Sequence, residues 1–184
     1  MNKTDINSIV ENIKLLTEDT KEFLLKVKSK YVIDDLILKL LNNHDLKYSI
    51  SESENHPLVK VNVDMGSFEK GIFKINYNFM ILFSKLLTKV THDYFTFEVV
   101  NRDPNRISSV LSNDSYHPLT QNQFKFFEEY KLVAKKIEYV RLSRRDLEFV
   151  VCSETHNFKG LHSFGDQPTL EMLVFNDFFN LIPE

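Results

Sequence analysis

Residues 71–90, GIFKINYNFMILFSKLLTKV, are the most apolar stretch of the sequence, and the predicted fold is organised around them. From Phe73 to Phe79, apolar and polar residues alternate, which is typical of a β-strand with one buried and one wet face. In the second half the apolar residues share a helical face instead: Phe79, Leu82, Phe83, Leu86, Leu87 and Val90. We therefore expect a strand that turns directly into a core helix. On that strand Lys74, Asn76 and Asn78 should face outward, and Phe73, Ile75, Tyr77 and Phe79 should be buried.

The 43 residues at the N-terminus predict helices, because their apolar residues recur every three or four positions. Thr17–Asp19 resembles a helix cap followed by acidic residues, so we expect one helix to end and another to begin there. Asn42 and Asn43 are a typical end for the last of these helices.

The hydrophobic period then changes to two, in residues 46–51, 59–65 and 73–79, which predicts a three-stranded antiparallel meander. Residues 94–100 are rich in aromatic and β-branched side chains and predict a fourth strand. The polar residues 101–118 predict a long loop, a feature that is usually functional or mobile.

A helix is expected over residues 119–136, capped by Thr120, with lysines at its C-terminal end. Residues 139–142 and 147–152 then predict two paired strands joined by a turn at 143–146. A second loop, residues 153–167, precedes a last amphipathic helix that opens at Pro168.

These elements predict an α+β fold with an antiparallel sheet of five or six strands, because strands and helices do not alternate singly along the chain. The expected organisation is one domain over residues 1–184, with a helical part at 1–43 and a sheet with packed helices at 44–184.

Composition excludes several classes of function. The single cysteine, Cys152, excludes an internal disulfide and CxxC zinc sites, and the four glycines include no phosphate-binding motif. We therefore expect no metal and no cofactor. The longest unbroken apolar run, Phe79–Phe83, is far shorter than the roughly 20 residues of a membrane span. No signal peptide is recognisable, so the sequence predicts a soluble, cytoplasmic protein that does not bind membranes.

A basic cluster is the strongest indication of a binding site. Lysines and arginines crowd residues 131–145, with Tyr130 and Tyr139 among them, as phosphates and stacked bases require. The net charge of -3 argues against nucleic acid, which stays possible, and favours a protein partner with an acidic surface. The predicted partner-binding residues combine this cluster with the arginines of the 101–118 loop: Arg102, Arg106, Lys135, Lys136, Arg141, Arg144 and Arg145.

The loop at 153–167 provides an alternative. Its side chains include imidazole and carboxylate groups suited to acid–base chemistry: Glu154, His156, His162 and Asp166. The same groups could converge on a metal ion, although their spacing is not diagnostic of a metal site. A Cys152–His156 pair is also conceivable, although the residues before Cys152 are apolar and a cysteine there is typical of buried packing.

The sequence thus predicts a non-enzymatic cytoplasmic protein-interaction module, of the inhibitor, immunity or antitoxin, or adaptor or chaperone kind, that acts by occluding a partner. The alternative is a hydrolase or nucleic-acid-processing enzyme that uses the 153–167 loop, with arginines holding an anionic substrate. A third class, single-strand nucleic-acid binding, would require steeply salt-dependent retention on heparin or an oligonucleotide.

Overall fold

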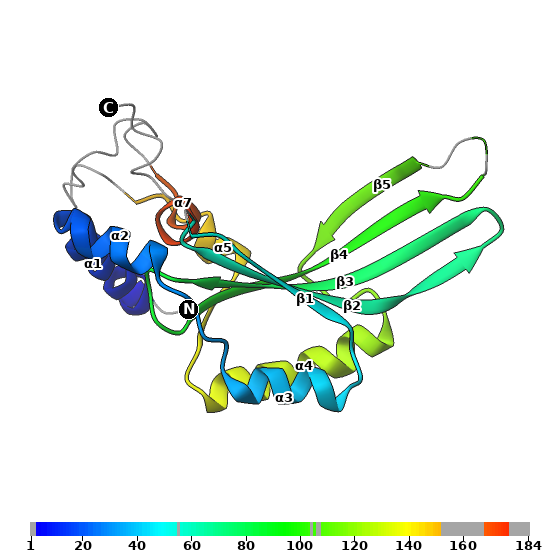
Figure 1. Cartoon of the computed structure of the whole chain (residues 1–184), viewed down its shortest axis with the longest axis horizontal. Coiled ribbons are helices and arrows are strands. Elements are labelled where there is room, and N and C mark those ends of the chain that lie inside the picture. The colour runs from blue at the N-terminus through cyan, green and yellow to red at the C-terminus, as the bar shows by residue number, and fades with distance from the viewer. Residues whose placement is uncertain (1–2, 55, 104, 106–107, 152–167, 177–184) are drawn as a thin grey trace.

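The structure is a computed structural model, and it describes residues 3–54, 56–103, 105, 108–151 and 168–176. A long, mostly antiparallel sheet carries helices on both of its faces toward one end, and its other end extends beyond them (Figure 1). The predicted α+β class and the predicted number of strands are confirmed.

The helices are α1 (Lys3–Glu18), α2 (Thr20–Lys28), α3 (Asp35–Asn43), α4 (Gln121–Lys136), α5 (Arg144–Leu147) and α7 (Leu170–Phe175). The strands are β1 (Tyr48–Glu52), β2 (Leu58–Lys70), β3 (Phe73–Ser84), β4 (Val90–Asn101), β5 (Ser108–Ser115) and β6 (Val140–Leu142).

The sheet has the order β1-β2-β3-β4-β5, in which each pair of neighbours is antiparallel. The short strand β6 runs parallel to the first residues of β4, along Val90–His92. β5 pairs with β4 farther on, from Phe95 to Asn101. Strands β5 and β6 therefore share one edge of β4.

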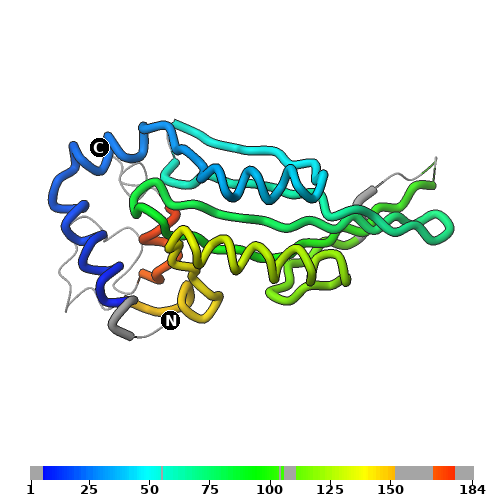
Figure 2. The backbone as a smooth tube through the Cα atoms, turned by 90° about the horizontal axis from the view of Figure 1, so that it is seen from below, coloured from blue at the N-terminus to red at the C-terminus, as the bar shows by residue number. Residues whose placement is uncertain are grey.

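Helices α3 and α4 lie side by side across one face of the sheet, which we call the helix face (Figure 2). The ring of Phe79 is central to this core and lies 5.0 Å from Phe95, 5.6 Å from Phe126 and 5.2 Å from Tyr130, measured between ring centroids. Aromatic packing of this kind adds to the free energy gained from burial alone.

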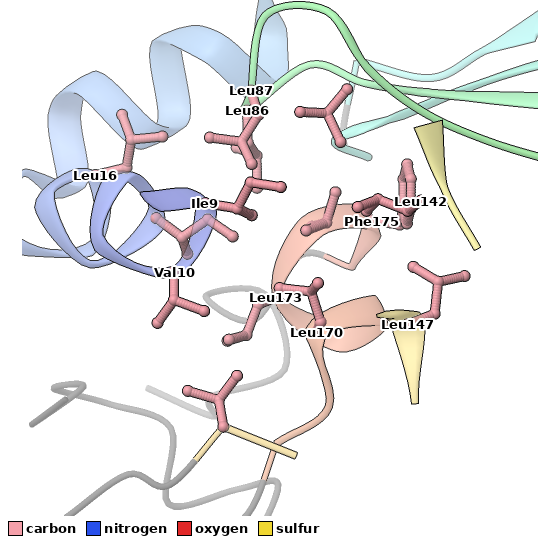
Figure 3. Packing of buried hydrophobic residues seen from close by; sticks show 14 of the residues in the cluster. Ile9, Val10, Leu16, Leu86, Leu87, Leu142, Leu147, Leu170, Leu173 and Phe175 are labelled. Atoms are coloured by element: carbon pink, nitrogen blue, oxygen red, sulfur yellow. The ribbon is translucent and has the colours of Figure 1, made fainter. Parts of the chain in front are cut away.

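A second core surrounds the connection between β3 and β4, where α1, α2, α5 and α7 meet (Figure 3). Leu86 and Leu87 of the connection point into it between α1 and α7, together with Ile9, Leu170 and Leu173. The Ser84 hydroxyl donates a hydrogen bond of 2.8 Å to the Val174 carbonyl and ties α7 to the end of β3. This second core lies toward the other face of the sheet, which we call the opposite face.

The predicted helix over Phe79–Val90 is wrong, because β3 continues to Ser84 and β4 begins at Val90. The apolar run does not alternate because this part of β3 is covered on both faces. Ile81 is fully buried toward the helix face, and Met80 is 4% exposed toward the opposite face. A strand buried on both faces reads as a continuous apolar run, which periodicity cannot distinguish from a buried helix.

The burial expected at the start of β3 is also partly wrong. Phe79 is fully buried, but Phe73 is 43% exposed, and Ile75 and Tyr77 are only half-buried. Lys74 and the two asparagines on the other side of the strand are half-buried as well. The described helices end before they reach the start of β3, so Phe73 and Ile75 gain no cover from them, whereas Tyr77 still packs against the core under α3 and α4 (Figures 1 and 2).

The predicted loop over residues 101–118 is wrong as well, since Ser108–Ser115 form β5. An edge strand that extends past the helices faces water, so its sequence needs no apolar alternation. Residues 143–146 are not a simple turn, because Ser143 and Asp146 form a reciprocal capping box that starts α5. The strand predicted at 147–152 is not formed among the described residues. In its place, Val150 and Thr169 form an isolated antiparallel β-bridge.

The predicted helix boundaries are largely confirmed. The Asp19 carboxylate accepts hydrogen bonds from the backbone amides of Lys21 and Glu22 and starts α2 at the expected break. Thr120 caps α4 in a capping box with Gln123. These are local hydrogen bonds, which explains why the sequence alone located them.

We expect Phe79→Ala to lower the free energy of unfolding by about 3 to 5 kcal/mol, because it leaves a cavity at the centre of the aromatic core. Phe73→Ala, on the same strand, should change it by less than about 1 kcal/mol because that ring is exposed. Urea denaturation followed by circular dichroism measures both. Equal losses for the two variants would contradict the position of the core.

An ion pair between the buried Lys85 and the partly exposed Glu52 side chain joins α2, β1 and the β3–β4 connection. The Lys85 ammonium lies 2.9 Å from a carboxylate oxygen of Glu52, and it donates hydrogen bonds to the carbonyls of Val27 and Ser53. Glu52 also accepts a hydrogen bond from the Tyr31 backbone amide. Burial alone would raise the pKa of Glu52, but these hydrogen bonds and the Lys85 charge outweigh it and lower that pKa.

A lowered pKa in the folded state means that Glu52 stabilises the protein above its unfolded pKa of about 4.3, and that this contribution disappears as the pH falls through the folded pKa. We expect Glu52→Gln to be less stable than the wild type by about 1 to 3 kcal/mol at pH 7. The difference should shrink toward pH 3. Denaturation curves across this range test it, with the exposed Glu54→Gln as the control, whose difference from the wild type should stay small at every pH.

Candidate functional site

Arg141, one of the predicted partner-binding residues, is part of the structure's internal scaffold. Its Nε and Nη2 donate to the two carboxylate oxygens of Asp93 at 2.7 and 2.6 Å. Its guanidinium lies 5.0 Å from the ring centre of Phe127 and 5.6 Å from that of Tyr130. Burial alone would lower the pKa of Arg141, but the bidentate pair with Asp93 raises it, so the guanidinium stays charged.

Two other predicted arginines are exposed and paired. Arg102 donates to Glu69 at 2.7 Å near the tip of the β2–β3 hairpin. Arg144, the first residue of α5, donates at 2.6 Å to Glu148, which caps the end of that helix, and its guanidinium lies 5.1 Å from the ring centre of Tyr116. The hydrogen bond and the charge of Glu148 raise the pKa of Arg144.

The remaining predicted residues divide into two groups. Lys135 and Lys136 end α4 and Arg145 lies in α5, and all three are exposed. Arg106 and Cys152 lie outside the described residues. So does the whole alternative catalytic set, which consists of Glu154, His156, His162 and Asp166. Arg102 lies at the far end of the sheet from α5, so the structure does not bring the described cations into one patch (Figure 1).

A different surface was missed by sequence reasoning. Phe68 of β2, Ile75 of β3, Val99 of β4 and Leu111 of β5 occupy paired positions across the four strands. Paired residues on neighbouring strands point to the same face, so these side chains form one row. Because Ile75 shares its face with Phe79, the row lies on the helix face, beyond the described helices (Figure 1).

A β-bulge places Phe68 in that row. The register between β2 and β3 shifts between Asp64 and Ser67, and Gly66 has a φ of 92°. Glycine tolerates this left-handed conformation, and the Asp64 carboxylate accepts a hydrogen bond of 2.8 Å from its amide. The extra residue reverses the alternation of β2, so Phe68 points to the helix face instead of the opposite face.

We define the apolar patch as Phe68, Ile72, Phe73, Ile75, Val99 and Leu111. Ile72 joins it from the two-residue turn between β2 and β3, where Gly71 adopts a φ of 61°. Phe68 is 55% exposed and Leu111 is 53% exposed. A hollow of about 550 Å³ lies within the patch and includes Lys70 in its lining. The arrangement combines apolar contact area with a nearby cation.

The part of the chain that the structure describes holds no group of three or more histidine, cysteine, aspartate or glutamate side chains placed to bind a metal ion. Over the same residues, no helix combines the length and the hydrophobicity needed to cross a membrane.

Comparison with known proteins finds no family model, no curated protein and no solved structure that matches this chain.

The different roles of the arginines can be measured. Arg141→Lys should lower the free energy of unfolding by about 1 to 2 kcal/mol, because lysine cannot form the bidentate pair with Asp93 or stack on the two rings. Arg144→Lys, at an exposed ion pair, should change it by less than about 0.5 kcal/mol. If Arg141→Lys were as stable as the wild type, the structural role assigned to Arg141 would be wrong.

Proposed function

We propose that this protein is a non-enzymatic, cytoplasmic protein-interaction module that binds a protein partner through the apolar patch. One observation carries the proposal: four neighbouring strands each contribute an apolar side chain to a continuous row on a sheet face that no described helix covers. An inhibitor, an immunity protein or antitoxin, and an adaptor or chaperone are the kinds of protein that this proposal includes, because each binds a protein partner.

Leaving this row of apolar side chains in water is unfavourable in free energy. Single exposed apolar residues are ordinary, whereas a contiguous exposed patch marks a site of interaction or aggregation. Phe68, Ile72, Phe73 and Leu111 are each more than two-fifths exposed. A partner that covers them gains the free energy of removing apolar surface from water.

The charges beside the patch support a partner with acidic groups around an apolar centre. Lys70 lines the hollow, and Arg102 lies close by in its pair with Glu69. Charges at the rim of an interface mainly speed association and orient the partner, while the buried aromatic residues supply most of the affinity. The projecting sheet allows a partner to approach without displacing α3 or α4 (Figure 1).

The alternative functions are less well supported. Nucleic-acid binding requires arginines free to contact phosphates, and three of the predicted arginines are paired with carboxylates: Arg102, Arg141 and Arg144. The residues of the enzymatic alternative lie outside the described part of the chain, so that alternative remains a prediction of the sequence.

The test is affinity purification from extracts of the source cells with two matched variants as bait. Phe68→Ser/Leu111→Ser removes the two most exposed side chains of the row, one at each end, and Leu25→Ser/Val32→Ser removes exposed apolar residues elsewhere, at 70% and 80% exposure. A stoichiometric partner should purify with the wild type and the control. Its affinity for the patch variant, measured afterwards with purified proteins, should fall at least about thirtyfold.

Two results would overturn the proposal. One is a partner that binds the patch variant and the wild type equally. The other is sedimentation equilibrium showing a wild-type dimer that becomes a monomer in the patch variant, since the patch would then bind a second copy of the chain. All substituted positions are exposed, so unchanged thermal unfolding of both variants excludes misfolding as the cause.

A further inference from the structure

A second site lies on the opposite face of the sheet, away from the apolar patch. It is a pocket of about 220 Å³ where α5 and α7 meet β4 and the end of β5. Its lining combines aromatic, acidic and basic side chains with two leucines: Leu82, His92, Tyr94, Asp114, Tyr116, Arg144, Leu147, Glu148 and Glu171. The proposed protein-interaction function makes no use of this pocket.

His92 supplies a hydrogen-bond acceptor to the pocket. The residue is 4% exposed, and its Nδ1 lies 2.8 Å from the carbonyl oxygen of Leu142 on β6. Because a carbonyl only accepts, Nδ1 donates, and Nε2 of the neutral ring is then an acceptor. Nε2 has no hydrogen-bond partner among the described residues. A buried imidazole with one hydrogen-bonded and one unpartnered nitrogen in the wall of a pocket is suited to a ligand that donates a hydrogen bond.

Aromatic rings form much of the same wall. The ring of His92 is stacked 5.5 Å from that of Tyr94 and lies 5.9 Å from that of Tyr116, between centroids. The faces of tyrosine rings attract cations. This wall already holds one, because the Arg144 guanidinium lies 5.1 Å from the centre of Tyr116.

The carboxylates around the pocket exceed its cations. Glu148 is paired with Arg144, whereas Asp114 and Glu171 form no ion pair with any described residue. Burial is the largest cause of the raised pKa of Tyr94, and the charges of Asp114 and Glu171 raise it further. Both carboxylates therefore lie close enough to influence the pocket. The pocket therefore has negative charge, aromatic faces and an acceptor nitrogen, all of which favour a positively charged donor.

We propose that this pocket binds an organic cation that carries N–H groups, either a protonated primary amine or a guanidinium. The cation would lie against Tyr94 and Tyr116, donate a hydrogen bond to His92 Nε2, and be neutralised by Asp114 and Glu171. Arg144 occupies one ring face and competes with the ligand. Free amines and lysine or arginine side chains of proteins share this chemistry.

Titrations with propylammonium and ethylguanidinium, followed by ¹H–¹⁵N NMR, test the proposal. We expect saturable shifts at the amides of residues around the pocket, and weaker binding of tetramethylammonium, which has the charge but no N–H. Asp114→Asn/Glu171→Gln should weaken binding at least about tenfold. The matched control is Glu98→Gln, on the same face of β4 but outside the pocket, and it should bind as the wild type does.

The variant Arg144→Gln distinguishes a change in ligand binding from a loss of folded protein, because the expected change is a gain in affinity. It removes the competing cation from Tyr116 and should strengthen binding about threefold, an increase that a purely structural role does not produce. Comparing propylammonium with the peptide acetyl-Gly-Lys-Gly-amide distinguishes the two sources. Tighter binding of the peptide assigns a protein side chain, and tighter binding of the small amine assigns a free ligand.

Three results would overturn the inference. They are the absence of saturable shifts at the pocket, equal binding by tetramethylammonium, and shifts that the Asp114/Glu171 variant leaves unchanged. The apolar patch lies on the other face of the sheet, so Phe68→Ser/Leu111→Ser should bind the amine normally. The two proposals can therefore fail separately.

Discussion

Burial of the central part of β3 on both faces is the constraint on which the rest of the structure depends. Phe79, Ile81 and Phe83 point to the helix face and Met80 points to the opposite face, so the strand needs a cover on each side. Helices α3 and α4 supply one cover. The cluster of α1, α2, α5 and α7 gathers at the β3–β4 connection toward the other side. The helices are placed where this strand would otherwise expose apolar surface on both sides.

The sheet is longer than the described helices that cover it, and this difference in length leaves a row of apolar side chains accessible to solvent. Along β3 the same alternation produces a fully buried Phe79 and a 43% exposed Phe73. The bulge at Gly66 then turns Phe68 to the helix face, in line with Ile75. A face patterned for burial is left without a cover among the described residues, which is why we place the protein-interaction function there.

The charged residues also have roles in the structure that differ from those that the sequence suggests. The sequence suggests that the arginines of the basic cluster and of the 101–118 region are available to a partner. Three of them have a carboxylate partner in the structure, and Arg141 is held between α4 and Asp93. In the pocket that His92 also lines, the carboxylates of Asp114 and Glu171 form no ion pair with any described residue. The pocket on the opposite face therefore favours a cation, although the sequence drew attention to anionic partners.

The sequence by itself determined the elements that depend on local interactions. The helix start at Asp19 and the capped α4 at Thr120 rest on hydrogen bonds within a few residues. The α+β class follows from the periods of two and 3.6 residues, which each segment contains within itself. Only the tertiary structure decided whether the run at Phe79–Phe83 is a strand or a helix, because the answer depends on what covers its second face. It also decided which apolar residues stay exposed and which charges are paired, because those outcomes depend on neighbours that are distant in the sequence.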